Sequence, residues 1–541
     1  MLTAERHPIA VVPGLHRLFL DYCSQVAAAR GFFASGPLDE SWREGGQASS
    51  GRPAHWASLV SLLAEQNASP SPAAAAALDA LRSGAGTVVT GQQVGLLGGP
   101  LFTPFKAATA LARAREATAA GQPHAAIFWL AAEDHDFAEI NHVVFPARRE
   151  LRTLTWTRAP DVARPVGGIV LDESITALVD EARELLGNSD AMEALAEAYR
   201  PGRTLAQAFA EFYLKAFAAQ GLLVLDASGR EFHRMGAPVL RAALERADEL
   251  HSALMERNRE LEAAGYHAQV NVAPDSSLLF LIDEESGERM ALKRTAASVA
   301  EPDGLWHAGR QSYSTAELVT ILEAAPERIS PSALLRPVFQ DFLLSTSAII
   351  GGPAEIAYFA QSAVLYERIL GRVTPALPRF SATLVEPAIG TLLKQHELTL
   401  EQVFAETPAT LASRLAERAM PGAEKRKLET AGAALEAELT PLVDWMRALD
   451  AGLGQSAETA AGKIRYQMGR LRSLATNFEL QREASITRHA EAISQALYPG
   501  GGLQERLHGA AYYFARHGFE LAEEITVQAA NSSPGHTVMW L

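Results

Sequence analysis

The sequence contains few of the features that mark secreted, membrane-bound or nucleic-acid-binding proteins. Cys23 is the one cysteine among 541 residues, so we expect no internal disulfide and no cysteine-rich metal site. Basic residues number 48 against 63 acidic ones, and the net charge of −15 argues against a general nucleic-acid surface. No apolar run approaches the roughly 18 residues that a membrane-spanning helix needs.

The N-terminus also lacks a targeting signal. Its first residues, MLTAERHPIAVVPG, show no basic stretch followed by a long apolar core, and with the single cysteine this favours a reducing cytoplasm. Apolar residues, by contrast, are plentiful: 48% of the chain is hydrophobic and 21% is charged, which is enough to bury a large core. At 541 residues, we expect more than one domain.

Strands and helices alternate in the first half of the chain. Residues 87–90 form a β-branched strand that runs into the glycine-rich stretch GQQVGLLGGP, and a helix follows over 104–120. A second buried strand, AAIFWLAA, occupies 125–132, and a third, GLLVLDA, ends at Asp226 before another helix. This succession predicts βαβ units, an α/β fold class and a parallel sheet.

Later segments extend this pattern. SSLLFLID, at 276–283, suits a strand, and residues 336–370 are predicted to form a helix, a strand, a glycine turn and a second helix.

From about Leu392 the chain becomes rich in alanine, leucine, glutamate and arginine. Apolar residues alternate at spacings of three and four, which predicts a coiled-coil seam. The seam residues are Leu428, Gly432, Leu435, Leu439, Leu442, Met446, Leu449 and Leu453. GLGQSAET, at 452–459, is expected to break the helix, and the next helix carries Ile464, Met468, Leu471, Ala475 and Phe478. We predict an antiparallel hairpin; two ordinary amphipathic helices are the alternative.

The glycine-rich stretch is one candidate binding loop, because ligands of open α/β sheets lie at the carboxyl ends of the strands. Its glycines would let a ligand approach the backbone, its glutamines offer donors and acceptors, and a lysine in the next helix could reach a phosphate. These candidates are Gly91, Gln92, Gln93, Gly98, Gly99 and Lys106. The spacing fits neither GxGxxG nor a P-loop, so a purely structural turn is the alternative.

The stretch IFWLAAEDHDFAEINH changes abruptly from a buried strand into acidic residues and histidines. Asp134, His135, Asp136 and His142 are the catalytic candidates, since they could bind an amine or transfer a proton, and Asn141 is a binding candidate. Helix capping by one of the aspartates is the alternative. Two histidines and a glutamate could share a helical face, but HExxH is absent and we predict no metal.

A second glycine turn and the helix before it add polar groups. IIGGPAEIAYFAQ places Gly351 and Gly352 ahead of a helix with Glu355 in its first turn. LLRPVFQD brings Arg336 close to Asp341. Arg336 could bind a carboxylate or phosphate with two hydrogen bonds, and a structural arginine–aspartate pair is the alternative.

Four stretches, in order along nearly the full length, together resemble the BshC family of bacillithiol biosynthesis. They are TGQQVGLLGGPLFTPFKA, FWLAAEDHDFAEINH, LLRPVFQD with GGPAEIAYFAQ, and LQERLHGAAYYFARHG, whose Gln504 and Arg506 join the binding candidates. The resemblance implies a Rossmann-like parallel-sheet core with inserted connecting segments over 1–380. It also implies an α-helical coiled-coil domain over 381–541 that promotes homodimers, with the terminal segment returning to the core.

The resemblance implies an enzyme as well: a ligase that joins cysteine to the amine of glucosaminyl-malate. Because amide formation from a free carboxylate is uphill, we expect ATP or another nucleotide as co-substrate. The glycine loop and Lys106 would hold phosphates, and Arg336 the malate carboxylates. Asp134 and Asp136 would hold the ammonium of cysteine, and His135 or His142 would transfer a proton.

Two other classes remain open on the sequence: a non-catalytic nucleotide- or thiol-binding dimeric scaffold, and a Rossmann-type glycosyl- or nucleotidyl-transferase. In an enzyme the ionisable candidates should converge on one pocket, whereas in a scaffold they should lie scattered.

Overall fold

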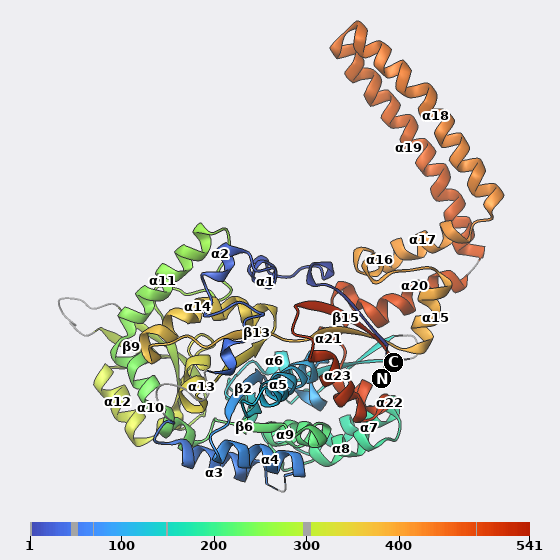
Figure 1. Cartoon of the computed structure of the whole chain (residues 1–541). Coiled ribbons are helices and arrows are strands. Elements are labelled where there is room, and N and C mark those ends of the chain that lie inside the picture. The colour runs from blue at the N-terminus through green and yellow to red at the C-terminus, as the bar shows by residue number, and fades with distance from the viewer. Residues whose placement is uncertain are drawn as a thin grey trace. The chain divides into compact units, whose positions relative to one another are not determined.

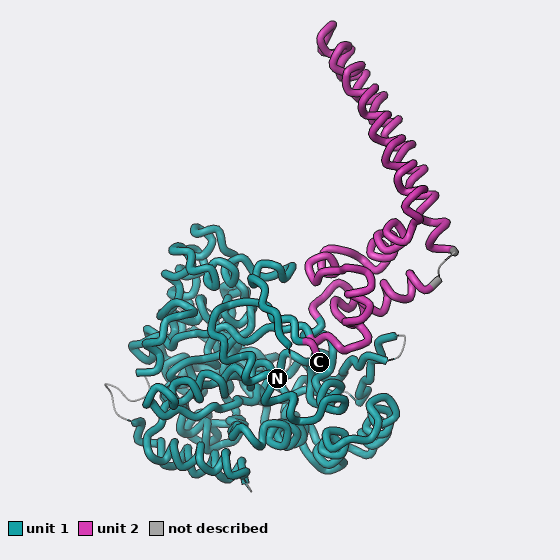
Figure 2. The backbone as a smooth tube through the Cα atoms, turned by 45° about the vertical axis from the view of Figure 1, so that its right-hand side comes forward, with its two compact units in different colours: residues 1–383, 504–539, 541 teal, residues 384–503, 540 magenta. Residues whose placement is uncertain are grey.

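The computed structural model describes residues 3–44, 52–68, 70–147, 150–158, 160–295, 304–482 and 484–541. The chain forms two compact units, coloured separately in Figure 2. Unit 1 comprises 1–383, 504–539 and 541, and unit 2 comprises 384–503 and 540. No helix among the described residues is long and apolar enough to cross a membrane.

A five-stranded parallel sheet of order β13-β12-β2-β3-β6 forms the centre of unit 1 (Figure 1). Its strands are β2 (Gly86–Gln92), β3 (His124–Leu130), β6 (Leu223–Asp226), β12 (Ala348–Gly351) and β13 (Ala376–Pro378). Helix α5 (Phe102–Ala119) connects β2 to β3. The predicted βαβ unit and the strand that ends at Asp226 are therefore confirmed, as are the elements predicted over 336–370, which form α13 (Arg336–Leu344), β12 and α14 (Pro353–Leu370).

The central strands are buried on both faces, which explains why they read as continuous apolar runs. Ile127 and Trp129 belong to the core on one face. Phe128 points to the other face and packs against Phe209 and Tyr213 of α9. The sheet is thus the middle of three layers. Helices of the first face are α3 (Trp56–Gln66), α4 (Pro72–Arg82), α10 (Arg230–Glu245) and α13, and those of the second include α5 and α9 (Leu205–Ala216).

The chain between β6 and β12 contributes a second five-stranded sheet, which is antiparallel and has the order β10-β9-β8-β7-β11. Its strands are β7 (Ser276–Ile282), β8 (Arg289–Thr295), β9 (Leu305–Ala308), β10 (Gln311–Tyr313) and β11 (Ile329–Pro331). SSLLFLID forms β7, so the strand predicted there is confirmed, and it lies in this inserted sheet. The same insertion holds α10, α11 (Ala247–Ala263) and α12 (Thr315–Ala324).

Residues 504–539 also belong to unit 1. They form α21 (Gln504–Leu507), α22 (Ala510–His517), α23 (Glu520–Ala529) and β15 (Gly535–Trp540), the middle strand of a sheet of order β1-β15-β14. The N–H of Leu101 donates to the carbonyl of His508, and the N–H of Ala510 donates to that of Gly99. The C-terminal segment therefore supplies backbone partners to the turn after β2. Remaining elements are β1 (Thr3–Pro8), α1 (Arg17–Cys23), α2 (Ala27–Arg30), α6 (Phe137–Ile140), β4 (His142–Pro146), β5 (Leu151–Thr155), α7 (Ser174–Leu186), α8 (Asp190–Ala198) and β14 (Ser381–Val385).

Unit 2 is helical. It contains α15 (Pro387–Gln395), α16 (Leu400–Ala405), α17 (Pro408–Ala419), α18 (Gly422–Leu449), α19 (Ala451–Arg482) and α20 (Ala484–Leu497). Helices α18 and α19 pack along each other as an antiparallel hairpin (Figure 1), which confirms the predicted pair.

The break between these two helices is at Asp450, so the break predicted over 452–459 is wrong. Asp450 is extended, and its Oδ1 accepts the N–H of Leu453 at 2.9 Å, which caps the first turn of α19. GLGQSAET lies inside that helix. An aspartate cap decides the boundary, whereas a glycine in a helix interior costs only about 1 kcal/mol.

The seam between the two helices also differs from the heptad prediction. Leu439 is buried as predicted, but the next buried residue of α18 is Val443, and Leu442 is 47% exposed. This step of four residues follows from the 3.6-residue turn of a straight helix, which drifts away from a strict seven-residue repeat. Leu449 and Leu453 are exposed as well.

In α19 the face toward α18 is made of small residues. Ala461 packs against Leu439 and Val443, with Ala457 beside it. Ile464, Leu471 and Phe478, which we predicted in the seam, are exposed instead. Small side chains allow the helices to approach closely, and a hydrophobic pattern built on large residues does not detect such a face.

Candidate functional site

The carboxyl ends of β2, β3 and β12 meet at one edge of the parallel sheet, where two cavities adjoin. The larger, about 130 Å³, is lined by Trp129, Ala131, Glu133, Asp134, His135, Phe280, Arg289, Pro331, Ala333 and Arg336. The smaller, about 20 Å³, is lined by Gly91, Trp129, Ala131, Arg336, Pro337, Gln340, Ile349, Ile350, Glu355, Tyr358 and Phe359. Trp129, Ala131 and Arg336 border both cavities, so the two share a wall, and we call the smaller one the inner recess.

Asp134 is held in the turn that follows β3. Its carboxylate accepts the side-chain N–H of Gln93 at 2.6 Å and the backbone N–H of His135 at 2.7 Å. Burial would raise the pKa of Asp134, but these hydrogen bonds and the charges of Arg336 and Arg289 lower it below its usual value. Asp134 is therefore an anion at neutral pH.

Arg289 enters the larger cavity from the inserted sheet. Its guanidinium stacks on Phe280, 3.7 Å from the ring centroid, and donates to Ser330 Oγ and to the carbonyl of Pro331. Burial lowers the pKa of Arg289 to about 10, so it keeps its charge at neutral pH. A third contact joins Nη1 to Nδ1 of His135 at 3.0 Å. Because arginine only donates, Nδ1 of His135 must be the acceptor.

Arg336, at the start of α13, is the cation common to both cavities. Burial alone would lower its pKa, but Tyr358, Asp134 and Glu355 raise it above the ordinary value. In the inner recess, the side chain of Gln340 is 4% exposed, and its Nε2 has no partner among the described protein atoms. The recess thus offers a cation and a buried donor to a small group.

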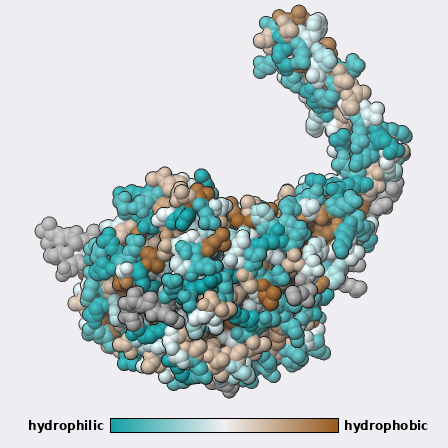
Figure 3. Space-filling model, in the orientation of Figure 1, coloured by the Kyte–Doolittle hydropathy of each residue, from teal (hydrophilic) through white to brown (hydrophobic). Residues whose placement is uncertain are grey.

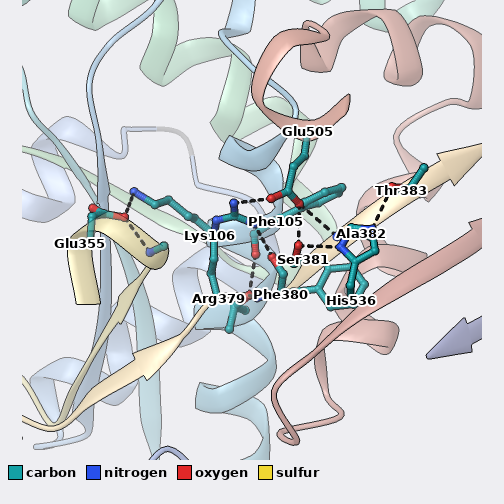
Figure 4. Close-up of polar contacts among 12 residues, drawn as sticks. Phe105, Lys106, Glu355, Arg379, Phe380, Ser381, Ala382, Thr383, Glu505 and His536 are labelled. Atoms are coloured by element: carbon teal, nitrogen blue, oxygen red, sulfur yellow. Dashed lines mark hydrogen bonds and ion pairs between the residues drawn. The ribbon is translucent and has the colours of Figure 1, made fainter. Parts of the chain in front are cut away.

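Lys106 reaches the same edge from inside α5, as Figure 4 shows for its contact with Glu355. It is 2% exposed, and Nζ lies 2.5 Å from Glu355 Oε2, 2.6 Å from the carbonyl of Gly91 and 2.9 Å from Gln92 Oε1. These three acceptors match the three N–H donors of an ammonium group. Glu355 in turn accepts the N–H of Gly352, at the start of α14. The cluster ties the ends of β2 and β12 together.

The later glycines of the loop pack away from the two cavities. The hydroxyl of Tyr199 accepts the N–H of Gly98 at 3.0 Å and donates to the carbonyl of Gly95 at 2.6 Å. A Cβ on Gly98 would lie 2.8 Å from Phe212, and Gly98 and Gly99 both have positive φ, at 86° and 65°. These glycines are needed for a tight turn against α9.

The remaining candidates lie around this edge or outside the residues that line it. Asp136 caps α6 by accepting the N–H of Glu139, and His142 is exposed beside Asn141. Asp341 is buried and accepts from Arg372 and Thr374 and from the N–H of Thr346. Gly351 ends β12 beside Phe359, Gln504 is buried in α21, and Arg506 is exposed there. The ligand-binding roles of all these residues stay predictions.

Several site residues were not among the predicted ones: Glu133, His233, Arg289, Gln340 and Tyr358. Glu133 could have been found, since it lies directly after β3 with the other acids. Arg289 comes from the inserted sheet, and no local pattern marks it.

Beside Lys106, Figure 4 shows a second buried polar cluster, which joins β14 to the C-terminal segment. Arg379 and Glu505 form an ion pair of 2.5 Å, and Ser381 donates to Glu505 at 3.1 Å. His536 lies 2.9 Å from Ser381 and from Thr383, and burial lowers its pKa to about 4. This cluster is buried and links β14 to the C-terminal segment beside the site.

Comparison with known proteins gives matches along the whole chain. Residues 6–380 match the family described as "Bacillithiol biosynthesis BshC, N-terminal Rossmann-like domain", and residues 382–541 match its C-terminal coiled-coil domain. Similar proteins named "Putative cysteine ligase BshC" occur in Koribacter versatilis, 40% identical over 98% of both chains, and in Solibacter usitatus, 35% identical over 98% of both. A third, from Salinibacter ruber, is 29% identical over 99% of this chain and 98% of the relative.

Proposed function

Because the chain belongs to the BshC family of bacillithiol biosynthesis, we propose that it is a cysteine ligase that forms an amide between cysteine and the amine of glucosaminyl-malate. One observation carries the proposal. Two cations, Arg289 and Arg336, and two anions, Glu133 and Asp134, converge on one small cavity at the strand ends. An amino acid carries both charges at neutral pH, and such a cavity complements it. A scaffold would not need this convergence.

The parts of cysteine can be assigned to the cavity by their chemistry. The arginines suit its carboxylate, which they can bind with paired hydrogen bonds, and Asp134 suits its ammonium. We assign the thiol to the inner recess, whose volume of about 20 Å³ accepts one small group, with Gln340 as the donor.

The activating nucleotide, for which we propose ATP, supplies the energy of the amide bond by converting the cysteine carboxylate into an acyl-phosphate or acyl-adenylate. Lys106 already has three protein acceptors, so we assign the negative charge of the activated carboxyl group to Arg289 and Arg336. Gly91, whose carbonyl is held by Lys106, borders the inner recess on the β2 side.

We further propose that the protein is a homodimer. Large apolar side chains are exposed along the hairpin of unit 2, and Figure 3 shows apolar surface at its tip. The exposed residues are Leu442, Trp445, Leu449, Leu453, Ile464, Tyr466, Leu471, Leu474 and Phe478. So many exposed large apolar side chains on one hairpin favour an interaction surface, and a second copy of the hairpin carries the same side chains.

A direct assay tests the enzymatic proposal. Purified protein is incubated with cysteine, glucosaminyl-malate and ATP, and bacillithiol is measured by thiol mass spectrometry, with reactions lacking ATP as the control. Release of AMP identifies an acyl-adenylate and release of ADP an acyl-phosphate. In cells that lack the protein, we expect glucosaminyl-malate to accumulate and bacillithiol to disappear. Unchanged bacillithiol in those cells would refute the ligase.

A further inference from the structure

At the larger cavity, Glu133 forms an ion pair with the buried His233, and the assignments above give this pair no part in the chemical step. Glu133 lines the cavity directly after β3, and its Oε1 is 2.9 Å from Nε2 of His233. His233 is fully buried in α10, whereas the Glu133 side chain is 13% exposed. The carboxylate therefore has one side toward the cavity and the other against an imidazole that solvent does not reach.

The surroundings of His233 require a proton between these two side chains. Its Nδ1 lies 3.0 Å from the carbonyl oxygen of Ile329, which can only accept, so Nδ1 carries a hydrogen. In a neutral ring, Nε2 would then present its lone pair to a carboxylate at 2.9 Å, which is repulsive. The pair is stable only when a proton lies between Nε2 and Oε1.

The charges around the pair favour that protonated state. Burial would lower the pKa of His233, but Glu133 and the carbonyls of Ile329 and Pro326 raise it above the usual value. Asp226, at the end of β6, faces both partners, and burial raises its pKa. On the cavity side, Arg289 faces Glu133, and Asp134 and Arg336 lie next to it.

The histidines predicted as proton carriers are placed less well for this task. Nδ1 of His135 accepts a hydrogen bond from Arg289, so its lone pair is already engaged. His142 is exposed in the β4 strand, outside the residues that line either cavity.

We propose that Glu133 is the base that takes the proton of the attacking amine, and that His233 is a positioning residue that holds the Glu133 carboxylate toward the cavity. This assignment rests on the ligase function proposed above. The amine nitrogen attacks the activated carboxyl carbon, and a C–N bond forms. The C–O bond to the leaving phosphate or nucleotide breaks, and its electron pair goes to the leaving oxygen. The proton of the nitrogen moves to an oxygen of Glu133.

Three variants test the pair through the pH profile of kcat. Glu133→Gln should lower kcat by about 10² to 10⁴-fold, the usual contribution of a general base, and leave KM for cysteine within a few-fold. His233→Gln removes the positive charge beside the Glu133 carboxylate, and the acidic limb of the profile should move to higher pH. The double variant should be no slower than Glu133→Gln alone, because the two residues act as a unit.

Two matched substitutions serve as controls. Glu231→Gln changes an exposed glutamate on α10, the helix that carries His233, and His251→Gln changes a histidine on α11. Both should keep the wild-type profile. A readout independent of activity is the nitrogen-15 spectrum of labelled histidine, with the His233 signal assigned by its loss in His233→Gln. It should show both ring nitrogens protonated above pH 6.5.

The outcomes separate the two proposals. Wild-type protein without ligase activity removes the proposed function and the base with it. Active wild type with a Glu133→Gln variant that retains more than a tenth of kcat removes Glu133 as the base and keeps the ligase. If the His233→Gln variant folds and has a lower kcat but an unchanged acidic limb of the pH profile, His233 has only a structural role. If that variant does not fold, a neutral His233 at pH 6 in the wild-type spectrum overturns the pair.

Discussion

Replacing Lys106 by methionine should destabilise unit 1 strongly, although the two side chains have similar length. Lys106 is 2% exposed and satisfies Glu355, Gly91 and Gln92 together. Removing one partner of a buried ion pair costs about 3 to 5 kcal/mol, because the other charge stays behind without compensation. Glu355 is 22% exposed and keeps the N–H of Gly352, so we expect the lower end, about 3 kcal/mol.

Urea unfolding followed by tryptophan fluorescence measures this loss, since most of the seven tryptophans lie in unit 1. Lys215→Met is the matched control: its ion pair with Glu197 is exposed on both sides and should leave the midpoint unchanged. Glu355→Gln should also destabilise, and the double variant should lose about 2 kcal/mol less than the sum of the two single losses.

Lys106→Met should also change substrate binding. Gly91 borders the inner recess, and its carbonyl and the side chain of Gln92 are fixed by Lys106. KM for cysteine should therefore rise in Lys106→Met even where the protein is fully folded. A loss below about 1 kcal/mol, together with an unchanged KM, would show that the cluster is solvated in solution and that this account of the strand ends is wrong.

Three further predictions concern other parts of the chain. His536, with a pKa of about 4 when folded and about 6.5 when unfolded, takes up its proton on unfolding, so stability falls as pH falls from 6.5 to 4, by about 3 kcal/mol. The stability difference between wild type and His536→Gln should shrink across that window, and a constant difference would contradict the buried neutral histidine. Tyr199→Phe leaves the N–H of Gly98 and the carbonyl of Gly95 unpaired and should lower the free energy of unfolding in urea by about 2 kcal/mol. A loss below about 0.5 kcal/mol would show that the Tyr199 hydroxyl does not hold the glycine turn. In unit 2, Leu474→Asp with Phe478→Asp should give a folded monomer by light scattering, whereas Leu439→Asp, inside the hairpin, should keep the dimer and melt lower; a dimer that persists in the first variant places the interface elsewhere.

The sequence allowed the parallel sheet and the edge that carries the candidate site to be predicted, because both follow from local patterns. Apolar runs such as AAIFWLAA mark strands buried on both faces, and the polar residues after each run must then lie at the carboxyl end. Asp134 and Gly91 were found in this way. No tertiary information was needed for either.

Arg289, His233 and the hairpin seam required information that local patterns lack. Arg289 reaches the cavity because β8 pairs with β7 in an inserted sheet, and the register of that pairing is a tertiary property. His233 reads as one polar residue in an amphipathic helix, and only its contact with Glu133 distinguishes it. In α19 the inward face is alanine-rich, so a search for large apolar residues selected the outward face.

The return of the C-terminal segment to the turn after β2 constrains the order of events during translation. The backbone partners of Leu101 and Gly99 are His508 and Ala510, which are translated about 400 residues later. At roughly 5–20 residues per second, the intervening stretch of about 400 residues takes some 20 to 80 s to synthesise. The hairpin of unit 2 is produced within that interval and can fold on its own local contacts. The turn beside the site is completed only after residues 508–510 have been made, so a nascent chain carries the strands of the site without the finished loop.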